Sequence, residues 1–277
     1  MIGILLTAIG TFLNEAASSF GKWEILHKRE NLYTFGFLNN FWLVVIFVGI
    51  VVVKGNFLFD PASIPLLSLL IVLEFAQAYS TLHAVAEADR STLGFIMIGT
   101  IPLLLLTDTI LGYDINIFNM FGISVIVLGL IILLINHGIN KKGIGYVIFS
   151  TLNAVITISI YKYCITYYNS VEAQQVITST FILLFLGIMS IIKYEQNPFL
   201  YIFKKEFLVQ SVSNGLGSVI TSTAYIYAPA SVITSGKRAF SILWSIISGN
   251  KIFHEKHIVV KIVSFTFIII GLALLVM

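Results

Sequence analysis

Two stretches of the chain, "AYSTLHAVAEADRSTLG" at 78–94 and "ITSTAYIYAPASVITSG" at 220–236, align when the sequence is shifted by 142 positions. The aligned identities are Ser80 with Ser222, Thr81 with Thr223, Ala86 with Ala228, Ala88 with Ala230, Thr92 with Thr234, and Gly94 with Gly236. The same shift places Gly129 in "VLGLIILL" on Gly271 in "IIGLALLV". A shift of 140 places "GTFLNEAASSFGK" on "STLNAVITISIYK". The recurrence of small and polar residues at nearly one offset indicates two copies of one unit, 1–140 and 141–277.

The composition of the chain is that of a membrane protein. Of its 277 residues, 58% are hydrophobic and 10% are charged, and the mean hydropathy is +0.97. Soluble domains are about 45–50% apolar and about 25% charged. The single cysteine, Cys164, excludes an internal disulfide and a cysteine-rich metal site. A net charge of +3 is too small to indicate a nucleic-acid partner, so the expected surroundings are the lipid bilayer.

A membrane-spanning helix needs about 20 mostly apolar residues, and the chain offers ten such segments. They are 2–21, 33–53, 63–86, 91–111, 117–136, 144–165, 171–193, 207–228, 230–253 and 258–277. Each copy of the repeat then holds five helices, and this odd number places the second copy upside down in the membrane. The predicted fold class is an all-α integral membrane protein with ten transmembrane helices in two inverted five-helix repeats.

The second half closes with "GNKIFHE" (249–255) and a last helix that carries Gly271. Together with ten helices in two five-helix halves, this ending resembles the drug/metabolite transporter superfamily in its EamA-type branch. In that family the repeat closes with an apolar helix, a segment that runs from glycine to glutamate, and a last helix with a late glycine. "GNKIFHE" (249–255) and Gly271 are similar to this pattern, whereas "LGYDI" in the first copy departs from it. The resemblance covers nearly the whole chain. It implies the ten-helix fold and transport, but it does not specify the solute.

Basic residues gather in alternate loops of the predicted topology. The residues concerned are Lys22, Lys28, Arg29, Arg90, Lys141, Lys142, Lys193, Lys204, Lys205, Lys251, Lys256 and Lys261, whereas the remaining loops hold essentially one, Lys54. Because cytoplasmic loops carry the excess of Lys and Arg, we expect a multi-pass protein of the plasma or inner membrane with both termini outside the cytoplasm. Many members of the superfamily run the other way, and here the prediction follows the charges.

Four charged residues fall well inside predicted helices: Glu15, Glu74, Lys237 and Arg238. A charge at mid-bilayer costs roughly 2.5–3.5 kcal/mol on insertion scales, so each of these needs a partner or a polar cavity. The repeat places uncharged Phe95 and Ile96 opposite Lys237 and Arg238. The pair is therefore predicted to bind a negative group of the substrate, with the bidentate fork of Arg238 as the main contact. The alternative is a buried ion-pair network that fixes helix packing.

Glu15 lies in "NEAASSFGK" (14–22), which resembles the first helix of the small multidrug-resistance branch of the same superfamily. That branch has one essential membrane glutamate, so the resemblance implies proton or cation coupling at Glu15. The alternative reading makes Glu15 an ion-pair partner of Arg238. Glu74 is predicted as a second coupling residue.

Other polar side chains lie in the predicted helices and are candidate substrate contacts. They are Asn40, Gln77, Tyr79, Gln175, Asn214 and Trp244. Interhelical hydrogen bonding explains each of them equally well. The small residues of "SNGLGS" (213–218) predict a close approach between two helices, and Lys22, near a helix end, is predicted to extend to the membrane interface.

These features favour a secondary active transporter that moves a small polar or anionic metabolite by alternating access around a central site, with proton coupling as an option. One alternative is a proton-coupled exporter of organic cations or drugs, and another, of a different class, is a structural membrane protein. No nucleophile–base pair indicates an enzyme, no cofactor is expected, and His254, Glu255 and His257 lack a further ligand for a metal. The expected partners are the small-molecule substrate and lipid, and both a monomer and a homodimer stay open.

Overall fold

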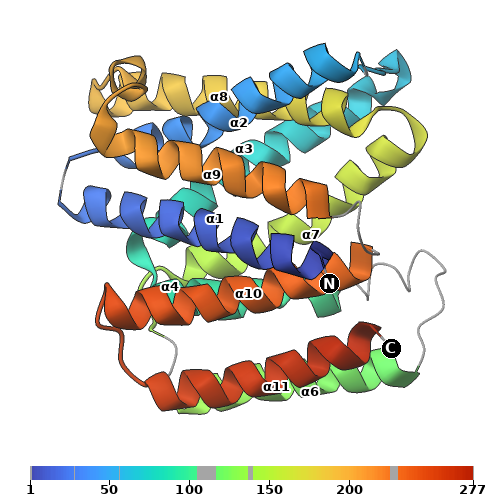
Figure 1. Cartoon of the computed structure of the whole chain (residues 1–277), viewed down its shortest axis with the longest axis vertical. Coiled ribbons are helices and arrows are strands. Elements are labelled where there is room, and N and C mark those ends of the chain that lie inside the picture. Colours follow the sequence, from blue (N-terminus) through green and yellow to red (C-terminus); the bar gives the residue numbers. More distant parts are fainter. Residues whose placement is uncertain are drawn as a thin grey trace.

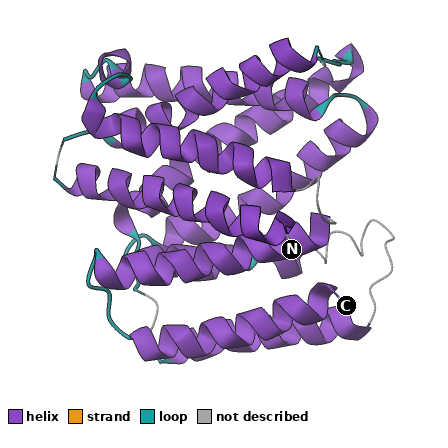
Figure 2. Cartoon of the chain, in the orientation of Figure 1, coloured by secondary structure: helices purple, strands orange, loops and turns teal. Residues whose placement is uncertain are grey.

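The computed structural model describes residues 2–27, 29–55, 57–104, 117–136, 140–224 and 230–276. This described part consists of helices joined by loops and contains no strand (Figure 2). The α-helices are α1 (Ile2–Leu26), α2 (Leu32–Lys54), α3 (Ile64–Glu87), α4 (Arg90–Met97), α6 (Ile117–Ile135), α7 (Ile144–Tyr167), α8 (Val171–Tyr194), α9 (Lys205–Ala224), α10 (Ala230–Lys251) and α11 (Ile258–Val276). Two short 3₁₀ helices, η1 (Pro61–Ser63) and η2 (Pro198–Tyr201), precede α3 and α9.

The helices lie side by side with nearly parallel axes, so their ends form two opposite faces of the molecule (Figure 1). Helices α9, α1, α10 and α11 form one layer, and α3, α7, α4 and α6 form a layer behind it. The main contacts are α1 with α9 and α10, α3 with α7 and α8, α2 with α8 and α9, α4 with α10 and α7, and α11 with α6 and α10. The start of α1 and the end of α11 lie at the same face (Figure 1).

Local sequence signals fix several helix ends. Asn31 caps the start of α2, where its side chain accepts from the backbone N–H groups of Tyr33 and Thr34 at 2.9 Å. Gly55 ends the same helix in the left-handed conformation, φ 64°, which glycine adopts without steric cost. Ser170 caps α8 by accepting from Ala173 N at 3.2 Å. Such caps satisfy backbone groups that the helix itself leaves unpaired.

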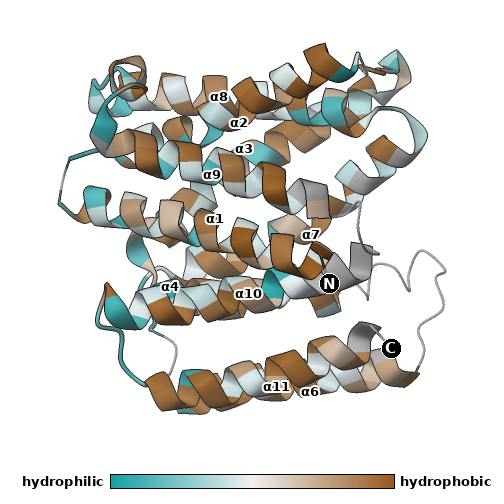
Figure 3. Ribbon diagram, in the orientation of Figure 1, coloured by the Kyte–Doolittle hydropathy of each residue, from teal (hydrophilic) through white to brown (hydrophobic). Residues whose placement is uncertain are grey.

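Among the described residues, five helical segments are long and apolar enough to cross a membrane: Ile2–Leu26, Leu32–Lys54, Pro61–Glu87, Ile144–Ile165 and Val171–Tyr194. Shorter apolar helices cover Arg90–Leu104, Met120–Leu133 and Ile258–Leu274. Apolar residues dominate most helices in Figure 3, and large hydrophobic side chains stay exposed on their outer surfaces. This arrangement is that of a membrane protein, because lipid is the solvent that such surfaces require.

The helix predicted over 91–111 differs from the observed structure. Helix α4 ends at Met97, residues 98 and 99 form a turn, and a helical segment resumes at Thr100. At the turn, Ile98 N bonds to Phe95 O at 3.3 Å and Gly99 N bonds to Ile96 O at 3.0 Å. These tight i→i−3 bonds interrupt the α-helical pattern, and hydrophobicity alone does not reveal them. Residues 105–111 of the predicted span lie outside the described residues.

The predicted close approach at "SNGLGS" is confirmed between α1 and α9. A Cβ atom placed on Gly217 would lie 2.7 Å from the carbonyl oxygen of Gly10, and one on Gly10 would lie 2.8 Å from the carbonyl oxygen of Gly217. Only glycine leaves room for two backbones at this separation. Gly215 packs in the same way against α2, where its Cβ would lie 3.1 Å from Ile46.

Helices α6 and α11 pack through two glycines in reciprocal contacts. A Cβ on Gly129 would lie 3.1 Å from Ser264 O and 3.4 Å from Ile268. A Cβ on Gly271 would lie 2.8 Å from Gly122 O and 2.6 Å from Ile126. In the sequence, Gly271, Ser264 and Ile268 follow Gly129, Gly122 and Ile126 by 142 positions each. The residues packed against Gly129 are therefore the ones that the 142-position shift aligns with the residues packed against Gly271.

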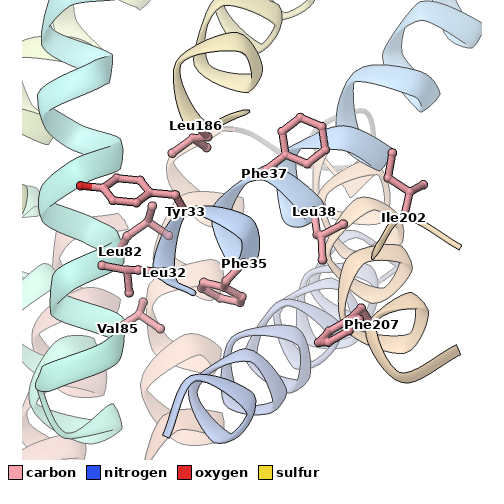
Figure 4. Packing of buried hydrophobic residues seen from close by; sticks show 10 residues of the cluster. All are labelled: Leu32, Tyr33, Phe35, Phe37, Leu38, Leu82, Val85, Leu186, Ile202 and Phe207. Atoms are coloured by element: carbon pink, nitrogen blue, oxygen red, sulfur yellow. The ribbon is translucent and has the colours of Figure 1, made fainter. Parts of the chain in front are cut away.

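A hydrophobic core joins α2 to its neighbours at one edge of the molecule. Figure 4 shows its buried residues: Leu32, Tyr33, Phe35, Phe37, Leu38, Leu82, Val85, Leu186, Ile202 and Phe207. They come from α2, α3, α8, the segment after η2, and α9. This packing holds helices of both sequence halves together and positions the link between α1 and α2.

Candidate functional site: a buried ionic cluster

A buried ion pair joins α1 to the start of α4. Arg90 donates from Nε and Nη2 to the two carboxylate oxygens of Glu15, at 3.0 and 2.8 Å. Both side chains are buried, 3% and 9% exposed. Ser19 and Ser248 also donate to Glu15 Oε1, at 3.0 and 2.6 Å. The carboxylate is therefore fully engaged by a bidentate fork and two hydroxyls, which is the strong form of such a pair.

A second carboxylate, Glu255, continues the cluster from the link between α10 and α11. It accepts from Arg90 N at 2.5 Å, from the Ser91 hydroxyl, and from Lys261 Nζ at 3.0 Å. Asp89 directly precedes α4, but its side chain makes no capping bond, so Glu255 caps this helix from a distance in sequence. Burial raises the pKa of Glu255, but bonds from Ser91 and Lys261 and the lysine charge outweigh burial and hold it below its ordinary value.

Lys22 completes the cluster. Its ammonium group donates to the carbonyl oxygen of Ala88 and lies 4.9 Å from the centre of the Phe253 ring. The side chain is buried, so the prediction that it extends to the interface is wrong. The physical reason is that the link between α3 and α4 offers a carbonyl acceptor inside the bundle. The cluster then holds three cations, Lys22, Arg90 and Lys261, against two carboxylates.

The cluster connects the two sequence halves at one face of the molecule. Glu15, Lys22 and Arg90 belong to the first half, and Ser248, Glu255 and Lys261 to the second. The links α1–α2, α3–α4 and α10–α11 all lie at this face, on the left in Figure 1. The repeat places Val155, Val232 and Tyr113 opposite Glu15, Arg90 and Glu255. These three charges therefore have no charged counterparts in the repeat, whereas Lys22 aligns with Lys162.

Three of the predicted substrate contacts bond to backbone carbonyls of neighbouring helices. Asn40 Nδ2 donates to Ser179 O at 2.6 Å, joining α2 to α8. Asn214 Nδ2 donates to Asn39 O at 3.0 Å, joining α9 to α2. Trp244 Nε1 donates to Ala8 O at 3.1 Å, joining α10 to α1. These geometries favour the alternative that the side chains hold helices together.

Gln77 and Glu74 both face α7 from α3. Gln77 donates to Ser150 Oγ at 2.6 Å and accepts from Asn153 Nδ2 at 2.9 Å. Glu74 is half-buried against Thr157 and forms no ion pair with another described residue. Of the two predicted coupling acids, Glu74 is therefore the one without a described countercharge.

The remaining candidates are placed as follows. On α10, Lys237 is exposed and Arg238 is half-buried, and Gln175 is half-buried on α8. Tyr79 is exposed, and its ring lies 4.5 Å from that of His83. The described contacts of Glu15 are with Arg90, Ser19 and Ser248, which places it in a different cluster from the predicted substrate clamp.

Arg90, Ser248 and Lys261 are site residues that were not predicted from the sequence. Arg90 and Lys261 were identified there only as loop charges. The stretch "GNKIFHE" did point to this site, because it ends in Glu255, the residue that caps α4. The pairing of Glu15 with Arg90 joins positions 75 residues apart, which a single sequence does not reveal.

Two cavities lined by described residues adjoin the end of α3. The first, of about 700 Å³, lies between α3, the start of α7 and α8. The second, of about 610 Å³, lies between the α1–α2 link, α3 and the end of α8. Its polar lining includes Glu30, Glu87 and Glu195. Glu87 lines both cavities, so they meet at this residue. Within the described residues, no group of side chains suited to holding a metal ion occurs.

No model of a known protein family matches the chain, and no curated protein shows significant sequence similarity to it.

Proposed function

We propose that the protein is a secondary active transporter of a small polar or anionic metabolite, built from ten membrane-spanning helices in two inverted repeats, 1–140 and 141–277. The observation that carries the proposal is the reciprocal packing of Gly129 and Gly271 between α6 and α11. A two-fold relation between the halves produces such paired contacts. Inverted repeats around a two-fold axis in the membrane plane are typical of secondary transporters.

The wider packing of the helices supports the same relation. Exchanging the halves turns α1 into α7, α2 into α8, α3 into α9, α4 into α10, and α6 into α11. Under this exchange the contact of α1 with α9 becomes that of α7 with α3, and α1 with α10 becomes α7 with α4; all four contacts are present. The contacts α2–α8, α4–α10 and α6–α11 map onto themselves.

In this proposal the ionic cluster is a gate. A transporter that works by alternating access closes one side of its central site while the other is open. Glu255 of the α10–α11 link accepts from Arg90 N and Ser91 at the start of α4, and Ser248 of α10 donates to Glu15 of α1, so the second half is tied to the first at this face. These contacts hold the Lys- and Arg-rich face closed, and the halves must separate there once in each cycle.

Arg238 and Lys237 are proposed to bind a carboxylate or phosphate of the substrate, and Glu74 to carry the coupling proton. Both roles suit their positions in apolar helices, where ionisable side chains mark substrate and ion pathways. The full engagement of Glu15 by Arg90 and two hydroxyls disfavours the alternative of an organic-cation exporter led by this glutamate, because a bound cation would have to displace that ion pair.

The test is uptake into proteoliposomes. Liposomes that hold the pure protein are incubated with a defined mixture of organic acids, phosphorylated metabolites, amino acids and organic cations, and the captured solutes are identified by mass spectrometry. The proposal expects time-dependent accumulation of an anionic or polar solute above protein-free liposomes. Accumulation of organic cations alone would favour the alternative, and no uptake of any solute would contradict a transport function.

The substitution Arg238→Lys separates substrate binding from packing. Lysine keeps the charge but loses the bidentate fork. Charge-assisted hydrogen bonds contribute roughly 1.5–3 kcal/mol, so the affinity for the captured solute should fall about tenfold to a hundredfold while the melting temperature changes little. A lower melting temperature at unchanged affinity would instead assign Arg238 to helix packing.

A further inference from the structure

The cavity between α3, α7 and α8 has an apolar floor made mainly of aromatic rings. Phe75 and Phe185 stack with their ring centres 4.7 Å apart, and Ala76 and Phe149 add to the apolar lining. Phe75 and Glu87 are 12 residues apart on α3, so the lining extends roughly 18 Å along this helix. It is apolar near the middle of the helix and polar at the helix end. A volume of about 700 Å³ is within the range of sites that hold small ligands.

The cavity belongs to the outer surface of the bundle. Tyr79 continues a stripe of exposed side chains on α3 that includes Leu69 and Val72. Phe149 belongs to a similar stripe on α7, with Leu152 and Ile156 exposed further along. Both helices are long and apolar enough to cross a membrane. Because these stripes are apolar, the cavity opens toward the acyl chains of the surrounding lipid.

The polar end of the cavity carries one negative and one positive side chain. Glu87 is 38% exposed and lies 3.3 Å from His83 Nδ1, and the imidazole ring stacks on Tyr146 with the ring centres 4.8 Å apart. Lys141, in the link before α7, is exposed and forms no ion pair with any other described residue. A ligand that satisfies this end therefore carries both an anionic and a cationic group.

We propose that this cavity binds a zwitterionic phospholipid of the membrane. Its ammonium group pairs with Glu87 beside the rings of Tyr79 and Tyr146, its phosphate pairs with Lys141, and one acyl chain lies along Phe75, Ala76 and Phe149. The charges of the polar end complement the headgroup, and the length of apolar lining suits an acyl chain. This inference does not depend on the proposed transport function.

Lipid binding to the purified full-length protein tests the proposal. Delipidated protein in detergent is titrated with phosphatidylethanolamine, phosphatidylcholine and phosphatidylglycerol of identical acyl chains, and bound lipid is counted by native mass spectrometry. The two zwitterionic lipids should bind about tenfold more tightly than the anionic one, because only they carry a charge-assisted partner for Glu87. The substitution Glu87→Gln should remove this preference.

Matched substitutions locate the binding. A Cβ on Gly145 meets no atom within 4 Å, so Gly145→Leu fills the cavity without a backbone clash. Gly49, on α2, is equally open, and Gly49→Leu is the control. The proposal expects lost lipid binding only in Gly145→Leu, and weaker binding in Lys141→Gln than in Lys142→Gln. Equal binding by the two leucine variants, tighter binding of phosphatidylglycerol, or no retained lipid would overturn it.

Discussion

For single residues, the main energetic question is how the charges of Glu15 and Arg90 can be buried together. Removing two charges from water costs several kcal/mol for each ion, and good geometry with further hydrogen bonds is required to offset that cost. The pair has such geometry, with two parallel donors from Arg90 and hydroxyls from Ser19 and Ser248. A buried pair of this kind stabilises little over an apolar pair but penalises any arrangement that separates its members.

Glu15→Gln should therefore destabilise the protein strongly, because it leaves the Arg90 charge buried and unpaired. The expected loss is about 3–5 kcal/mol in the free energy of unfolding, measured by denaturant titration in detergent. Adding Arg90→Met should recover most of the lost free energy of unfolding, whereas adding Arg238→Met should not. Rescue by Arg238→Met in place of Arg90→Met would show that Glu15 has been assigned the wrong partner.

Glu30, in the link between α1 and α2, should make stability depend on pH. Burial raises its pKa from 4.5 to about 8, although Gln210 donates to it at 3.1 Å. Because the folded protein holds this proton more tightly than the unfolded chain, the stabilisation is complete below pH 4.5 and is lost as the pH rises toward 8. Glu30→Gln should flatten the stability profile in this window. An unchanged slope in the variant would contradict the assignment.

At the scale of the elements, the sequence predicted most helices to within a few residues, because twenty-residue apolar runs leave few alternatives. It failed at α4, where the turn at 98–99 depends on local backbone geometry. For the site, composition located Glu15 inside a helix but not its partner. Arg90 begins α4 beside a polar link, and it reaches Glu15 only because α4 and α1 both pack on α10.

A substitution at Gly217 tests how closely α1 and α9 pack. Gly217→Ala would place a Cβ 2.7 Å from the carbonyl oxygen of Gly10, and the backbone there has no flexible end that can move away. Overpacking of this kind costs roughly 1–3 kcal/mol, so the melting temperature in detergent should fall. Gly49→Ala, where a Cβ meets open space, is the control. Equal melting temperatures for the two variants would contradict the close contact.

At the scale of the whole molecule, the two halves share backbone contacts and differ in charge. The glycine contacts of α6 and α11 recur at one offset, whereas Glu15, Arg90 and Glu255 have uncharged counterparts in Val155, Val232 and Tyr113. Shared packing maintains a common scaffold. In the proposed transport cycle, one face would close through hydrogen bonds to buried carboxylates and the other without them, so the two closed states need not be equally stable.

The orientation in the membrane is a prediction from the loop charges. The links at the face of the ionic cluster carry most of the loop lysines and arginines, so by the positive-inside rule we expect this face in the cytoplasm and both termini outside. A C-terminal reporter that fluoresces only in the cytoplasm should stay dark, while the same reporter inserted between Lys141 and Lys142 should fluoresce. A bright C-terminal fusion would reverse the assigned orientation.

The most direct test of the account is a reversible cross-link across the proposed gate. A Cβ on Gly94, in α4, would lie 3.4 Å from the Cβ of Ser245, in α10, close to the separation of about 3.5–4.5 Å found in disulfides. In a Cys164→Ser background, which removes the single native cysteine, Gly94→Cys with Ser245→Cys should cross-link under oxidation. If transport requires α4 and α10 to separate here, proteoliposome uptake stops on oxidation and returns on reduction, while each single variant is insensitive to oxidant. Undiminished uptake by fully cross-linked protein would contradict it.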